Sequence, residues 1–262
     1  MSEQSYHFDN TCVIITGESA GIGRSIAQQF GKAGAYVINA DISPDPKADV
    51  ETLPTHEKII SEGGKSEYVE TDISNPDDID RAIERARDAG GVDVLVNNAG
   101  IFAGEKFNTV TEQEFDNMYD VNVKGPFFFT QKVSRDLKRR DSDGAVINIA
   151  SISSNLAQHG QTLYDSTKGA VRMLTRGFAL ELAEYGIRVN GIAPGQIGTE
   201  IKEGWSTDAQ QMVDDDQLIK PVPMNRAGVP SDISPTALFL ASDAAEYITG
   251  EIIHVDGGWQ II

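Results

Sequence analysis

Tyr164 and Lys168 stand four positions apart in the chain, and Ser151 precedes Tyr164 by thirteen positions. Residues i and i+4 of a helix share a face, so the lysine ammonium can lie beside the phenol and favour its ionised form. A tyrosine with a free pKa of about 10 could then exchange protons near neutral pH. We interpret Tyr164 as a candidate general acid/base for chemistry at a hydroxyl or carbonyl group. Taken alone, the same pair also fits an exposed amphipathic helix, and Ser151 also fits a helix cap.

A glycine-rich turn at residues 16–23 directly follows an apolar strand pattern. Gly17 and Gly21 allow the backbone to approach a pyrophosphate, and Gly23 allows the following helix to pack closely. The N–H groups at the start of that helix attract phosphate. A glycine-rich turn by itself is weak evidence, but this one has a strand before it, a helix after it and a second strand next. The pattern therefore predicts a dinucleotide site.

Asp41 ends the second strand pattern, 24 positions after Gly17. An acid about 20 residues beyond such a turn can bind the ribose diol of the dinucleotide. A 2′-phosphate would face this carboxylate, and Glu18 in the turn would add a second negative charge. The sequence therefore favours NAD over NADP as the cofactor. For Asp41 alone, a solvated strand end is the simpler alternative.

Apolar runs of strand length alternate with stretches of helical period, which is typical of a parallel sheet covered by helices. No linker, repeat or low-complexity segment interrupts this alternation, so we expect one domain over residues 1–262. The polar, proline-containing residues 199–228 suit a mobile cover over a substrate cleft. The expected strands are residues 12–16, 36–41, 66–71, 92–97, 145–150, 187–192 and 251–255. Two of the expected helices start at Gly21 and Asn75. The others span residues 54–62, 112–139 (bent near Gly125 and Pro126), 163–185 and 233–242.

The 262-residue chain has 40 acidic and 22 basic side chains, a net charge of −18. That charge argues against general binding to nucleic acid or to an anionic membrane. It predicts an acidic surface, which is either an ordinary cytoplasmic one or an adaptation to high salt, where screening relieves repulsion among carboxylates. Cys12 is the one cysteine, and the first ten residues lack the apolar core of a signal peptide. We expect a cytoplasmic protein.

Five motifs follow one another along the chain: residues 16–23, the Asn-Asn-Ala-Gly segment at 97–100, Ser151, Tyr164 with Lys168, and Pro194 with Gly195. In this order and spacing, the chain resembles the short-chain dehydrogenase/reductase family from Thr11 to Gly258. The resemblance implies a single Rossmann-type, doubly wound α/β domain whose seven-stranded parallel sheet carries both cofactor and substrate. It also implies a homotetramer or homodimer, with the apolar tail at residues 259–262 near a subunit contact.

The resemblance implies four catalytic residues. Tyr164 is the general acid/base, and Lys168 stabilises the tyrosinate and holds the nicotinamide ribose. Ser151 hydrogen-bonds to the substrate oxygen, and Asn122 anchors a water in a proton relay to the lysine. Without the resemblance, Asn122 would be interpreted as an asparagine bonded to the helix backbone. The implied cofactor-binding residues are Gly17, Ser19, Gly21, Ile22, Gly23, Asp41, Asp72, Ile73, Asn98, Tyr164, Lys168, Ile197 and Thr199.

Substrate contact is expected from Ser151, Tyr164 and His159, which lies in the loop between the other two. A surface histidine is the plainer interpretation of His159. The other histidines, at positions 7, 56 and 254, have no spacing that makes a metal site, so no metal is expected.

Three functions are compatible with these residues. The favoured hypothesis is an NAD-dependent dehydrogenase that interconverts a secondary alcohol, preferably sugar- or polyol-like, and its ketone. A 3-oxoacyl thioester reductase is the second, although its carrier-linked substrates usually call for basic docking residues and NADPH. A non-catalytic dinucleotide sensor is the third, and such a protein would have no need of Ser151, Tyr164, Lys168 and Asn122 together.

Overall fold

The expected apolar runs form one seven-stranded sheet in a computed structural model of the chain. The structure describes residues 6–46, 53–104, 106–199, 205–215, 217–218 and 220–261. Every neighbouring pair of strands is parallel, and the strand order is β3-β2-β1-β4-β5-β6-β7. The strands are β1 (Cys12–Thr16), β2 (Tyr36–Asp41), β3 (Lys65–Glu70), β4 (Val94–Asn97), β5 (Gly144–Ile149), β6 (Ile187–Pro194) and β7 (Ile252–Val255).

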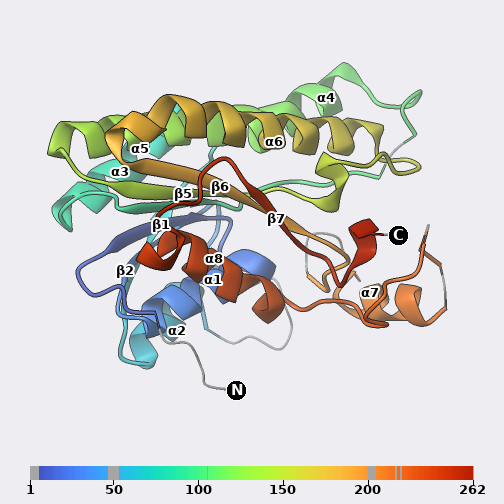
Figure 1. Cartoon of the computed structure of the whole chain (residues 1–262), viewed down its shortest axis with the longest axis horizontal. Helices are drawn as coiled ribbons and strands as arrows, with labels where there is room; N and C mark the ends of the chain where they lie inside the picture. Colours follow the sequence, from blue (N-terminus) through green and yellow to red (C-terminus); the bar gives the residue numbers. More distant parts are fainter. Residues whose placement is uncertain are drawn as a thin grey trace.

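Helices cover both faces of the sheet (Figure 1). One face carries α1 (Gly21–Lys32), α2 (Thr55–Ser61) and α8 (Pro230–Ala241), and the other carries α3 (Pro76–Asp88), α5 (Gly125–Arg140) and α6 (Thr162–Leu182). Each face has its own hydrophobic core, with Phe30 fully buried in one and Phe129 in the other. The predicted Rossmann-type, doubly wound single domain is confirmed.

The sheet places its switch point at β1, which lies between β2 and β4. In a doubly wound sheet, the connections leave the carboxyl ends of these strands in opposite directions and open a crevice there. The glycine turn follows β1, Asp41 ends β2 and Ser151 follows β5 closely. All three segments therefore reach the same edge of the sheet.

The long helix expected at residues 112–139 is interrupted. It consists of α4 (Glu112–Tyr119), a π-helical turn (Asp120–Lys124) and α5. Pro126 sits in the first turn of α5, where its missing N–H is tolerated. The expected bend thus takes the form of a π-helical turn, a feature frequently found at functional sites. It turns Asn122 inward, leaving that residue only 2% exposed.

Two features near the carboxyl end of the chain concern the expected cover and the apolar tail. Within the expected cover at residues 199–228, residues Trp205–Asp214 form the helix α7, whose Ala209 is buried. Residues 200–204, 216 and 219 of that cover lie outside the described part of the chain. Trp259 is buried by the chain itself, and its indole N–H donates to the Lys220 carbonyl at 2.9 Å. Ile261 is exposed, and the expectation that this tail lies near a subunit contact stays a prediction.

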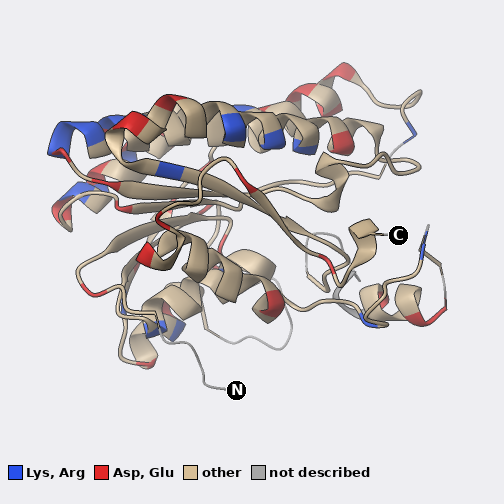
Figure 2. Ribbon diagram, in the orientation of Figure 1, with Lys and Arg blue, Asp and Glu red and all other residues tan. Residues whose placement is uncertain are grey.

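A charged cluster joins α3, α5 and the loop before β4. The Asp136 side chain is fully buried and accepts hydrogen bonds from Arg87 (2.9 Å), Arg139 (2.7 Å) and Arg140 (3.2 Å). It also accepts one from the Val92 backbone N–H at 3.3 Å. Figure 2 shows the basic residues gathered at these helix ends. Within the described part of the chain, the helices are too short or too polar to cross a membrane.

Candidate active site

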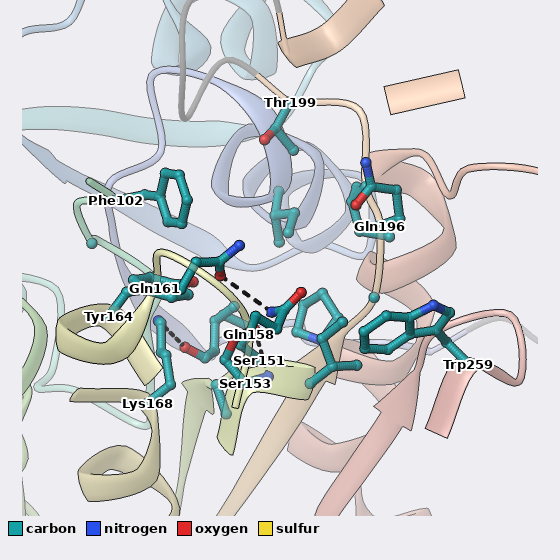
Figure 3. A pocket seen from close by; sticks show the side chains of 18 of the residues that line it. Phe102, Ser151, Ser153, Gln158, Gln161, Tyr164, Lys168, Gln196, Thr199 and Trp259 are labelled. Atoms are coloured by element: carbon teal, nitrogen blue, oxygen red, sulfur yellow. Dashed lines mark hydrogen bonds between the residues drawn. The ribbon is translucent and has the colours of Figure 1, made fainter. Parts of the chain in front are cut away.

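Two neighbouring cavities lie at the carboxyl edge of the sheet. The first is lined by the glycine turn, Asp41 and Asp72, and the second by Ser151, Tyr164 and Lys168. Their shared lining residues are Ile22, Asn98, Gly100 and Thr199. Figure 3 shows Tyr164 and Lys168 on one side of the second cavity, with Gln196 and Trp259 on the opposite side. The arrangement suits a long ligand in the first cavity whose end reaches the second.

The glycines of the turn are required first by packing within the protein. Gly17 has φ +66°, and a Cβ there would lie 2.7 Å from Ala99 Cα. A Cβ on Gly23 would collide with the Gly17 carbonyl oxygen and with Asn98 Nδ2. Asn98 Nδ2 donates to the carbonyls of Thr16 (2.9 Å) and Gly17 (2.7 Å). The predicted cofactor residue Asn98 therefore fastens the turn to the loop after β4.

The start of α1 is free of side-chain capping. Ala20 is the N-cap residue and makes no side-chain cap hydrogen bond. The first N–H groups of an α-helix lack partners within the helix, so these groups can bind a phosphate. Gly21, with φ +54°, and Ile22 both line the first cavity beside this helix end. The uncapped N–H groups at the start of α1, beside the first cavity, therefore fit the pyrophosphate of a dinucleotide.

Asp41 lines the first cavity, and two backbone N–H groups hold its side chain. Its carboxylate accepts from the N–H groups of Ser19 (3.0 Å) and Ile42 (2.7 Å). Among the described residues that line this cavity, none is Arg or Lys. The expected second negative charge is wrong, because burial and the neighbouring Asp41 charge raise the pKa of Glu18 to about 8. Glu18 is 1% exposed and is therefore mostly protonated at neutral pH.

The remaining predicted cofactor residues divide into two groups. Asp72 and Ile73 line the first cavity, Ile197 lines the second, and Thr199 borders both. Ser19 and Gly23 line neither cavity within the described part of the chain. The Ser19 hydroxyl donates to the Ser43 carbonyl, and Gly23 packs behind the turn. For these two residues, the structure provides supporting contacts within the protein.

Ser151 and Tyr164 converge at the second cavity. Ser151 follows β5 and caps a short 3-10 helix, where its Oγ accepts from the Ser153 N–H at 3.1 Å. Tyr164 lies in the first turn of α6, is 9% exposed and hydrogen-bonds to the Ser151 side chain. The ring of Phe102 packs edge-on against the phenol ring, with centroids 5.0 Å apart.

The protonation of the Tyr–Lys pair differs from expectation. Burial raises the pKa of Tyr164 to about 12, with the Ser151 hydrogen bond acting in the opposite direction. Burial also lowers the pKa of Lys168 to about 8. The lysine Nζ lies 5.7 Å from the phenol ring centroid and donates to the Ile149 carbonyl at 2.9 Å. The i,i+4 spacing thus brings the two groups together, but desolvation disfavours the charged form of each.

Asn122 links the π-helical turn to the site. Its Oδ1 accepts from the Ile101 N–H at 2.8 Å, and its Nδ2 donates to the Ile101 carbonyl at 2.9 Å. Nδ2 also donates to Thr167 Oγ1 at 3.2 Å, one position before Lys168 in α6. Asn122 therefore ties the loop after β4 to the helix that bears Tyr164 and Lys168.

His159 is exposed and lies among the residues lining the second cavity. The sequence pattern indicates His159 in the 152–163 loop as a substrate contact, but it does not indicate the uncharged residues beside it. The one sequence signal for these neighbours is their position between Ser151 and Tyr164. Neutral amide side chains have no characteristic spacing that would identify them as substrate contacts. The lining side chains that the sequence pattern does not indicate include Phe102, Ser153, Gln158, Gln161, Gln196, Gln217 and Leu218.

Comparison with known sequences gives consistent matches along almost the whole chain. Residues 17–260 match the family model described as enoyl-(acyl carrier protein) reductase. A 3-oxoacyl-(acyl-carrier-protein) reductase, FabG, of Staphylococcus epidermidis is 40% identical over 250 residues, covering 95% of this chain and 98% of the relative. The 5-keto-D-gluconate 5-reductase of Escherichia coli is 38% identical over 254 residues, covering 95% of each chain.

Solved structures agree with these sequence matches. A short-chain type dehydrogenase/reductase from Mycobacterium marinum superposes with a TM-score of 0.89 at 31% identity, covering 98% of both chains. A Beutenbergia cavernae protein described as an NAD(P)-dependent gluconate 5-dehydrogenase, with bound NADP, has a TM-score of 0.88 at 29% identity, covering 99% of this chain and 100% of the other. The chain therefore belongs to the short-chain dehydrogenase/reductase family, as an oxidoreductase that acts on CH–OH and keto groups with a nicotinamide dinucleotide.

Proposed function

We propose that the protein is an NAD-dependent dehydrogenase that interconverts a secondary alcohol of sugar or polyol type and its ketone. The observation that carries the proposal is the junction of the two cavities. One ends at the Asp41 carboxylate, and the other holds the Tyr164 phenol and the Ser151 hydroxyl. A dinucleotide extended from Asp41 would bring its reactive end to these two hydroxyl groups.

The chain's own residues supply proton transfer and orientation. Tyr164 takes the hydroxyl proton when the alcohol is oxidised and returns it when the ketone is reduced. Ser151 donates a hydrogen bond to the substrate oxygen and fixes its distance from the phenol. Lys168, buried beside the ring, stabilises the tyrosinate that forms during oxidation. Ile197 and Thr199, which line the second cavity, would hold a nicotinamide, which would supply the hydride acceptor or donor.

Asp41 supports NAD rather than NADP. Its carboxylate can accept hydrogen bonds from the two hydroxyls of an adenosine ribose, whereas a 2′-phosphate would place like charges together. The B. cavernae relative binds NADP, so the carboxylate is the feature that would separate this chain from it. We expect kcat/KM with NADH to exceed that with NADPH by about 10–100-fold, since like charges in contact cost several kcal/mol.

Replacing the carboxylate tests this preference. Asp41→Ser should reduce the ratio of kcat/KM for NADH over NADPH by about tenfold or more, mainly by improving KM for NADPH. Initial rates with both cofactors and one ketone measure the ratio. Asp45→Ser is the matched control, because Asp45 is four residues away and outside the lining of the first cavity. An unchanged ratio in Asp41→Ser would contradict the assignment.

A second candidate function is the reduction of 3-oxoacyl thioesters. The S. epidermidis relative of that name and the matching family model favour it. The E. coli relative named for 5-keto-D-gluconate favours a sugar ketone. Asp41 and the net charge of −18 weigh against a carrier that docks on basic residues and against NADPH.

We also propose a homotetramer or homodimer. Large apolar side chains are exposed on the helices of one layer, namely Phe115 on α4, Phe128 on α5, and Met173 and Leu180 on α6. Exposed apolar patches of this kind commonly mark contacts with another protein surface. Sedimentation equilibrium at micromolar concentration measures the subunit number, and the mass of a single chain would contradict this proposal.

A further inference from the structure

A chain of hydrogen bonds crosses one wall of the second cavity. Gln158 Nε2 donates to Ser153 Oγ at 2.8 Å and to Gln161 Oε1 at 3.2 Å. Both amides line the cavity, and Figure 3 shows them side by side, facing Gln196 across it. Ser153 is 3% exposed, so the inner end of this chain is fixed inside the protein.

The orientation of the Gln158 amide follows from its two hydrogen bonds. Its nitrogen donates to Ser153 Oγ and to Gln161 Oε1. Asp165 accepts from the Gln158 backbone N–H at 2.7 Å, which holds the loop in place. An amide nitrogen has two N–H donors, and both of them are used here. Gln158 therefore presents its carbonyl oxygen to the cavity.

This orientation discriminates between hydroxyl groups and carboxylates. A hydroxyl can donate to the Gln158 oxygen and accept from the amide nitrogen of Gln161. An ionised carboxylate only accepts, so it would meet the Gln158 oxygen as a second acceptor and leave it unpaired. The Gln158–Gln161 pair is thus matched to a substrate that carries several hydroxyls.

The charges around the cavity favour a neutral substrate. Lys168 is the one Lys, Arg, Asp or Glu among the described lining residues. The residue is 6% exposed, and its ammonium donates to the Ile149 carbonyl. A carboxylate brought into this cavity would lose water, and the polar lining groups left to solvate it would be hydroxyls, amides and the His159 imidazole. The net charge of −18 also opposes the approach of an anion.

We propose that Gln158, Gln161 and Gln196 form a subsite for an uncharged polyhydroxy substrate, such as an alditol or a ketose, and that this subsite selects against sugar acids. This inference rests on the proposed function and narrows it. It separates the chain from its relatives named for gluconate and 5-keto-D-gluconate, whose substrates carry a carboxylate.

Matched substrate pairs test the inference directly. D-Glucitol and D-gluconate, galactitol and D-galactonate, and ribitol and D-ribonate each share one carbon configuration and differ in a terminal CH₂OH or carboxylate. With NAD as oxidant, we expect kcat/KM for the alditol to exceed that for the aldonate by about tenfold or more in every reacting pair. An aldonate oxidised as well as its alditol would overturn the subsite and leave the proposed function standing. Turnover of a 3-oxoacyl thioester with no turnover of any pair would overturn both.

A substitution in the subsite gives an independent readout. Gln158→Ala should raise KM for the preferred alditol about tenfold, leave kcat within about twofold and leave the Kd for NADH unchanged, because one hydrogen bond is lost outside the reacting centre. Gln113→Ala is the control, since Gln113 is an exposed glutamine of α4. Should Gln158→Ala lose its native circular dichroism, Gln161→Ala carries the same expectation, because Gln161 makes no side-chain cap bond to α6. An unchanged KM in a folded variant would overturn the proposal.

Discussion

Tyr164→Phe should lower kcat by about 10²–10⁴-fold while the Kd for NADH changes by less than about twofold. The substitution removes one oxygen atom from a side chain that is 9% exposed and packed against Phe102, so the shape of the cavity is kept. General acid/base catalysis by a positioned side chain contributes a factor of this size. Steady-state kinetics and NADH fluorescence titration measure the two quantities separately.

The same tyrosine predicts a pH dependence that differs between the two directions. Burial raises the pKa of Tyr164 to about 12, so at neutral pH the phenol is protonated and ready to donate to a ketone. As long as the pH is below this pKa, the ionised fraction of the phenol rises tenfold for each unit by which the pH increases. Between pH 6 and 7, where Lys168 with a pKa of about 8 still holds its proton, kcat/KM for alcohol oxidation should rise by up to tenfold per unit. Ketone reduction should stay nearly flat over the same range.

Tyr119→Phe is the matched control for both experiments. Tyr119 also lies near α6, where its hydroxyl donates to Ser166 at 3.1 Å, but it does not line the second cavity in the described structure. Its loss should leave kcat and the pH profile unchanged. If Tyr164→Phe kept a large part of the wild-type kcat, another group would have to transfer the proton, and a non-catalytic role for the tyrosine would follow.

Asp136→Ala should lower the free energy of unfolding by about 3 kcal/mol, the scale found when one partner of a buried ion pair is removed. The carboxylate side chain is fully buried and holds three arginines, Arg87, Arg139 and Arg140. Without it, Arg140, whose side chain is 21% exposed, keeps a largely buried charge that is paired with Asp93 and bonded to the Val92 carbonyl. Urea unfolding followed by circular dichroism at one protein concentration measures the loss.

The pH dependence of this loss has a definite sign. Burial by itself would raise the pKa of Asp136, but hydrogen bonds from Arg87 and the Val92 N–H, with the charges of Arg140 and Arg87, lower it below its usual range. A carboxyl with a lowered folded-state pKa contributes stability above its unfolded pKa of about 3.9. That contribution is lost as the pH falls through the folded-state value. Wild type and Asp136→Ala should therefore differ most at neutral pH, and the difference should shrink as the pH falls through the lowered folded-state pKa.

An exposed ion pair provides the comparison. Asp88 pairs with Arg85 at 3.3 Å on the same helix that carries Arg87, but its side chain is 72% exposed. Exposed pairs are screened by water and salt, so Asp88→Ala should leave the urea midpoint unchanged. Equal effects of the two substitutions would show that the buried cluster does not stabilise the fold.

Much of the fold could be predicted from the sequence because its cause is local. Alternating strand-length apolar runs and helical periods can bury their apolar faces only as a layered parallel sheet. The chain order then brings Gly17, Asp41 and Ser151 to one edge of that sheet, and the four-residue spacing brings Tyr164 near Lys168. These residues follow from pattern and spacing, which are properties of the linear chain.

Tertiary packing determined the pKa values of the reacting groups and the orientation of their neighbours, which the sequence pattern does not predict. The raised pKa of Tyr164, the lowered pKa of Lys168 and the neutral Glu18 all arise from burial by residues distant in sequence. The direction of the Gln158 amide likewise depends on Ser153 and Gln161, which contact it only in the folded loop. The sequence by itself determined the sheet, its crevice and the reacting groups in it. The solvation of those groups and the orientation of their neighbours were decided by the three-dimensional surroundings, because desolvation and hydrogen-bond direction depend on every atom nearby.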